Sequence, residues 1–163
     1  MNGNRKLWSA AILFAVATGL ALLPQHAASR PPLETSLPQA GVDEPVPAYH
    51  VQAPQGELPA TMNPELFTDP VVQNAYTAAA KIKKTLYREP CYCHCDRSQG
   101  HTSLLDCFAS KHGAGCNICI DEDFYTYEQS HKGKTAAQIR EGIIKGEWRS
   151  VDVSKYQKPL STK

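Results

Sequence analysis

The chain has 163 residues, of which 17 are lysine or arginine and 16 are aspartate or glutamate. With a formal net charge of +1 it offers no basic surface that could neutralise phosphates, so we do not expect nucleic acid as a partner. Six cysteines in so short a chain point instead to disulfides, metal ligands or thiol redox chemistry.

Residues 1–28 have the pattern of a secretory signal. Two basic residues precede an uncharged apolar run over residues 7–23, and small residues follow it up to Ala28. We expect a cleaved signal peptide or, if the segment is retained, an N-terminal anchor in the inner membrane. The basic residues before the run predict that the rest of the chain is exported to the periplasm or another extracytoplasmic space.

Residues 29–68 are rich in proline. Eight prolines lie between residues 31 and 64, and large apolar side chains are sparse. Such a composition buries too little surface to offset chain entropy, so we expect a proline-rich disordered linker. This leaves residues 69–150 for one cysteine-rich helical domain and residues 151–163 for a flexible tail.

Helix signals begin at the start of that domain. Thr68 or Asp69 can cap a first helix, Pro70 suits its first turn, and Pro90 prevents its continuation. A short helix is expected within residues 102–110, where leucine and phenylalanine can point inward.

Two further helices are expected towards the C-terminus. One covers about residues 117–131 and ends before Gly133, and the other starts at a capping box formed by Thr135 and Gln138. No stretch is typical of a strand of any length. The sequence therefore predicts an all-α fold, a small cysteine-rich bundle of three to four short helices.

The cysteines fall within 29 consecutive residues, at Cys91, Cys93, Cys95, Cys107, Cys116 and Cys119. An even number in a small exported domain is consistent with a disulfide framework. In an extended segment, however, the first three would point to one side, and pairing neighbours there would form strained rings. A soft metal ion has no such difficulty, because several thiolates can converge on it.

The pair in "CNIC" lies at the predicted start of a helix. A spacing of three places Cys116 and Cys119 on one helix face, where the first-turn N–H groups favour the thiolate form. The same spacing is that of a dithiol redox motif, although the βαβ pattern that usually accompanies that motif is absent from the sequence.

The candidate metal ligands are Cys91, Cys93, Cys95, Cys116, Cys119 and His94. Thiolates with imidazole suit Cu(I) or Zn.

Other polar residues of this window are expected to have structural roles. We expect His101 and His112 at the surface or at helix caps, and Cys107 at the periphery of the cluster or buried as a small hydrophobic residue. The three acids at 121–123 are interpreted as complementing the helix dipole.

The motif "PCYCHC" at residues 90–95 resembles that of a bacterial family named for the sequence PCYCGC. The similarity continues through "GHTSLLDCF", "HGAGCNIC" and "GKTAAQIR", over about residues 90–144. The resemblance implies an exported bacterial protein, often a lipoprotein, with no established biochemical role. Two features depart from it: His94 replaces the glycine of the motif, and no lipid-attachment cysteine follows the apolar run.

Three functions are compatible with these residues. The first is an exported metal-binding protein that sequesters or delivers a soft metal. The second is a disulfide-stapled helical module that binds an envelope partner protein, and the third is a thiol-redox protein using Cys116 and Cys119. No paired acids or nucleophile–base arrangement indicates another enzyme class, and we do not expect catalysis.

Overall fold

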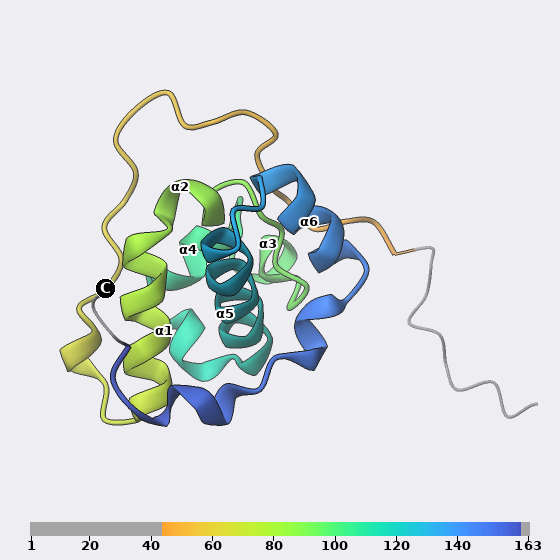
Figure 1. Ribbon diagram of the computed structural model, residues 1–163. Helices are drawn as coiled ribbons and strands as arrows, with labels where there is room; N and C mark the ends of the chain where they lie inside the picture. The colour runs from red at the N-terminus through yellow and green to blue at the C-terminus, as the bar shows by residue number, and fades with distance from the viewer. Residues whose placement is uncertain (1–43, 161–163) are drawn as a thin grey trace, which may run out of the picture. The chain divides into compact units, whose positions relative to one another are not determined.

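The computed structural model describes residues 44–160, and this part of the chain contains helices and no strand (Figure 1). The all-α fold class is confirmed. The predicted signal or anchor segment, residues 29–43 of the predicted linker and residues 161–163 lie outside the described residues. None of the helices described has the length and apolar character needed to cross a membrane.

The first predicted helix is divided into two. Helix α1 spans Pro70–Lys81, with the Asp69 carboxylate accepting a hydrogen bond from the Val71 N–H, and α2 spans Lys83–Leu86. Between them Ile82 leaves the helical conformation, with φ −118° and ψ 24°. The apolar spacing continues through this break, which is why the sequence pattern indicated one helix.

Four more helices complete the domain: α3 at Cys95–Ser98, α4 at Leu104–Phe108, α5 at Asn117–His131 and α6 at Ala136–Ile144. The limits of α5 agree with the prediction, and both hydrogen bonds of the expected capping box of Thr135 and Gln138 are present at α6. Short 3-10 helices lie at Pro64–Leu66 (η1), His112–Gly115 (η2), Glu147–Ser150 (η3) and Val153–Gln157 (η4).

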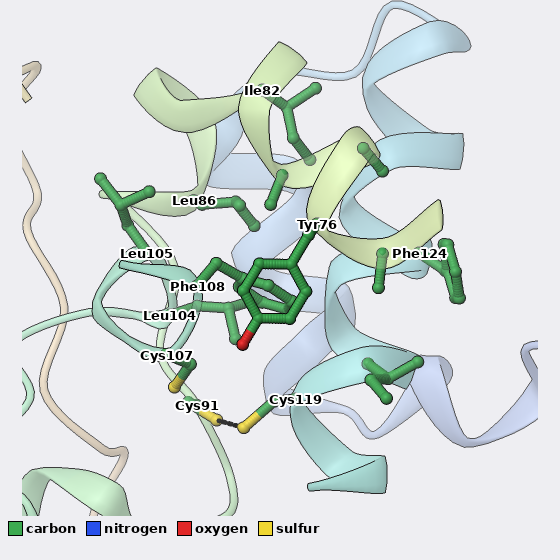
Figure 2. Close-up of a cluster of buried hydrophobic side chains, with 14 of the residues drawn as sticks. Tyr76, Ile82, Leu86, Cys91, Leu104, Leu105, Cys107, Phe108, Cys119 and Phe124 are labelled. Carbon is green, nitrogen blue, oxygen red and sulfur yellow. Dashed lines mark hydrogen bonds between the residues drawn. The ribbon is translucent and has the colours of Figure 1, made fainter. Parts of the chain in front are cut away.

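The main core lies where α1, α4 and α5 meet, and Tyr76 is at its centre (Figure 2). The Tyr76 ring meets Phe108 edge to face, with ring centroids 5.1 Å apart, and its hydroxyl donates to the Ser110 carbonyl at 2.7 Å. Figure 2 shows Cys91, Cys107 and Cys119 directly below this group of aromatic and leucine side chains. The sulfur atoms are therefore continuous with the hydrophobic core.

Residues 44–68 differ from the expectation of a disordered linker. They run as a long loop beside the helices (Figure 1), and the His50 ring stacks on Tyr87 with centroids 3.9 Å apart. The Arg88 guanidinium donates to the Val51 carbonyl at 2.8 Å, and the Met62 N–H donates to the Phe108 carbonyl at 2.9 Å. Their prolines favour an extended path, and their backbone groups find partners on the domain.

Residues 151–160 likewise differ from the expected flexible tail. The Tyr156 ring is buried and stacks on Phe124, with centroids 3.6 Å apart. The Asn74 side chain donates to the carbonyls of Tyr156 and Lys158 at 2.6 and 2.9 Å. This segment therefore forms part of the packed domain.

Candidate metal centre

All six cysteines lie in one region, although they come from four parts of the chain. Cys91 and Cys93 lie in the turn after α2, Cys95 begins α3 and Cys107 is in α4. At α5, Cys116 is the N-cap residue and Cys119 lies in the first turn. All six are free thiols.

The first three cysteines converge through a turn and not through an extended segment. The His94 N–H donates to the Cys91 carbonyl at 3.1 Å, and His94 itself has a left-handed conformation with φ 56°. Helix α3 then starts at Cys95. The turn carries Cys93 back towards Cys91, so their sulfur atoms are 3.2 Å apart.

The sulfur atoms of Cys91, Cys93 and Cys119 form a triangle. The Cys91 and Cys119 sulfurs are 3.5 Å apart (Figure 2), and those of Cys119 and Cys93 are 3.6 Å apart. These distances exceed the bond length of about 2.05 Å in a disulfide. They are close to the separation of about 3.8 Å that two thiolates have when each lies about 2.3 Å from one tetrahedral ion.

Cys107 and two histidines extend this triangle. The Cys107 sulfur is 3.4 Å from the Cys95 sulfur and 3.4 Å from His101 Nδ1. His112 Nε2 is 3.4 Å from the Cys93 sulfur. The arrangement therefore combines thiols and imidazoles, the ligands that soft and borderline metal ions prefer.

Three sets of four residues have ligand atoms that all lie within 4.8 Å of one another. The inner set is Cys91, Cys93, Cys107 and Cys119; the outer set is Cys93, His112, Cys116 and Cys119; and the third set is Cys93, Cys95, Cys107 and His112. Cys93 belongs to all three sets. The residues present thus fit a soft metal ion in number, chemistry and spacing.

The ligands differ in their exposure to solvent. Cys91, Cys95, Cys107 and Cys119 are buried, each with 2 % or less of its surface exposed. Cys93, Cys116 and His112 are half-buried. The cluster therefore has a closed side facing the core and an open edge facing solvent.

The thiols of the cluster do not share their protons equally. The pKa of Cys93 is lowered by the neighbouring thiols, Cys107 first, which favour its thiolate form. The pKa of Cys107 is lowered to about 4, chiefly by Cys119 and Cys91. The pKa values of Cys91, Cys95 and Cys119 are raised, in each case chiefly by Cys107. Loss of a proton, which gives the metal-binding thiolate, is thus favoured at Cys93 and Cys107 relative to the thiols around them.

Helix α5 also holds the turn that carries the first cysteines. The Glu122 carboxylate accepts a hydrogen bond from the Tyr92 N–H at 2.9 Å. Glu122 and Asp123 are completely buried, and burial raises both of their pKa values. The interpretation of these two residues as acids that complement the helix dipole is therefore wrong, because they lie beyond the first turn of α5 and face the core. Nothing in the run of three acids at residues 121–123 indicates that two of them face the core.

The structure brings five of the predicted ligands together and separates the sixth from them. His94 belongs to none of the three sets, and its Nε2 lies 3.3 Å from the Glu44 carboxylate. Cys107, expected at the periphery of the cluster or buried as a small hydrophobic residue, is buried and is also a member of two sets, and His112 is a member of two. No spacing in the sequence relates either residue to "CYC", because α4 and η2 bring them there through tertiary packing.

Comparison with known families shows which family the chain belongs to. A family model described as "Protein of unknown function with PCYCGC motif" matches residues 52–162, more than half of the chain. No curated protein matches the chain, and no solved structure matches it. The matched region contains all six cysteines, and it includes residues 52–68 of the predicted linker and residues 151–162 of the predicted tail.

Proposed function

The chain belongs to the family of proteins of unknown function with a PCYCGC motif, and from its cysteine cluster we propose that it is an exported protein that binds a soft metal ion, Cu(I) in preference to Zn(II). It would sequester the ion or deliver it to another protein of the cell envelope. The observation that carries this proposal is the convergence of six free thiols and His112 from separate elements.

The choice of Cu(I) rests on the number and kind of ligands. One tetrahedral Zn(II) ion uses four ligands, whereas the three sets together contain six thiols and an imidazole. Soft thiolate ligands select Cu(I), which two or three of them satisfy. Carboxylate oxygens, which Ca²⁺ and Mg²⁺ require, are absent from the three sets.

Export is supported by the basic, apolar and small-residue pattern of residues 1–28. Thiols outside the cytoplasm oxidise unless a metal ion or a reductant protects them. A metal-bound cluster is consistent with both the proposed location and the crowding of six sulfur atoms.

A second candidate function is the disulfide-stapled module that binds an envelope partner. Cys95 lies 3.4 Å from Cys107, and Cys91 lies 3.5 Å from Cys119, so modest movements would allow these pairs to oxidise. Cys93 and Cys116 share the outer set and could form a third pair. Counting thiols in the native protein distinguishes this candidate from metal binding.

The experiment that tests the proposal is a competition titration of the reduced protein with Cu(I) and with Zn(II) against a chelator of known affinity. We expect Cu(I) to be retained more tightly, and we expect Cys93→Ser to weaken binding by at least about 100-fold, because Cys93 belongs to every set. Ser154→Ala is the control, because its hydroxyl donates to Asp152 and it belongs to none of the three sets. If the protein competes with the chelator neither for Cu(I) nor for Zn(II), the proposal is refuted.

A further inference from the structure

The inner and outer sets share two residues, Cys93 and Cys119. We infer that the site binds at least two Cu(I) ions, one in each set, with the thiolates of Cys93 and Cys119 bridging them. This inference rests on the proposed function and adds the number of ions and the ligands of each. Cys91 and Cys107 would then belong to the inner ion alone, and Cys116 and His112 to the outer ion.

Bridging is chemically reasonable because the two residues that the sets share, Cys93 and Cys119, are cysteines. A thiolate sulfur has more than one lone pair and can bind two ions, whereas an imidazole nitrogen can bind only one. The shared residues of these two sets are both cysteines, and His112 is needed only once. The Cys93 sulfur already accepts from two neighbours, the Cys91 thiol at 3.2 Å and the Cys119 thiol at 3.6 Å. Metal ions replacing those protons would leave Cys93 between two centres.

The third set competes with this arrangement for His112 and Cys107. Ions can occupy the inner and outer sets at once without sharing an imidazole, whereas an ion in the third set would need His112 again. Cys95 remains as an additional thiol beside Cys107, 3.4 Å away. Each protonated thiol that becomes a ligand releases its proton to the solvent.

The two positions differ in their access to solvent. Three members of the inner set, Cys91, Cys107 and Cys119, are buried, whereas Cys116 and His112 of the outer set are half-buried. An incoming chelator or partner thiolate can therefore reach the outer ion first. The inner ion leaves only after the outer ligands have opened, so release occurs in two steps.

The test is the stoichiometry of Cu(I) bound to the reduced protein, measured by competition titration and native mass spectrometry, with X-ray absorption of the loaded form. We expect at least two ions, a copper–copper scattering path, and biphasic removal by a chelator. One ion and no such path would overturn this inference alone. Absence of any bound copper would overturn the proposed function itself.

Two variants identify the outer position. Cys116→Ser and His112→Ala should each remove the rapidly released phase and leave one slowly released ion. His131→Ala is the matched control, because His131 lies at the end of α5 and its Nδ1 is 2.8 Å from the Tyr127 carbonyl oxygen, away from the cluster. Circular dichroism establishes that each variant is folded. Retention of two ions with unchanged biphasic release in both variants would also contradict the inference.

Discussion

At the level of single residues, the motif's glycine position is explained by backbone conformation. His94 has φ 56°, and it is the one residue other than glycine in the described range 44–160 with a positive φ. Glycine adopts this conformation without the steric cost that a Cβ atom imposes, about 1–2 kcal/mol. A glycine at this position, as in the family motif, would therefore suit the turn between Cys93 and Cys95.

His94→Gly should consequently raise the free energy of unfolding by about 1 kcal/mol. The partly exposed contact of His94 with Glu44, at 3.3 Å, would be lost at small cost. Chemical denaturation of the metal-free protein measures the change, and Cu(I) stoichiometry should stay the same. A loss of copper on this substitution would show that His94 is a ligand after all.

The burial of Glu89 makes the stability of the protein depend on pH. Its carboxyl group is completely buried, and neither oxygen has a hydrogen-bond partner among the described residues. Burial raises its pKa from 4.5 to about 9, against the opposing influence of Arg140 and Arg88. In the unfolded chain Glu89 ionises near pH 4.5, whereas in the folded protein it stays protonated. Its contribution to stability is therefore fully present below pH 4.5 and decreases as the pH rises towards 9.

Glu89→Gln removes this ionisation. At pH 5 we expect the variant and the wild type to have nearly the same free energy of unfolding. At pH 8 we expect the variant to be the more stable, and this advantage should exceed the one at pH 5 by up to about 4 kcal/mol. Urea unfolding of both proteins in the metal-free state at the two pH values is the measurement. An equal difference between variant and wild type at both pH values would mean that Glu89 is ionised in the folded protein.

At the level of elements, the Asn74 side chain of α1 forms hydrogen bonds with the segment that follows η3. Asn74 is buried, donates to the carbonyls of Tyr156 and Lys158, and accepts from the Leu160 N–H at 3.1 Å. Asn74→Ala leaves these backbone groups without their partner, which should cost about 2 kcal/mol and expose residues 151–160 to proteolysis. Asn63→Ala is the matched control, because the Asn63 side chain bonds only to Glu65 beside it. Equal stability and protease resistance in the two variants would contradict the role assigned to Asn74.

The limits of several elements could be predicted because their signals are local. Pro70 after Asp69 marks the start of α1, and the pair Thr135 and Gln138 marks the start of α6. The break at Ile82 could not be predicted, since the apolar spacing continues across it. The turn at His94 was hidden for a related reason: alternating cysteines suggest an extended segment, and the glycine that would indicate a turn is replaced.

At the level of the whole molecule, the existence of a thiol cluster could be predicted, but its full membership could not. The spacing of Cys91, Cys93 and Cys95 indicates convergence because these residues are neighbours in the chain. Cys107 and His112 join the cluster only because α4 and α5 pack together on α1. The sequence places residues 44–68 and 151–160 outside the domain because their composition is typical of a linker and a tail. Their contacts could not be predicted, because they are made with residues far away in the sequence.

The central claim is that the six thiols bind a soft metal ion and not one another. It is tested most directly by native mass spectrometry of the protein isolated from its own compartment, with thiols counted after the metal is removed. We predict bound copper, at least two ions per chain, and six thiols that react with an alkylating reagent once the metal has been chelated. A metal-free protein with three intact disulfides would contradict the claim.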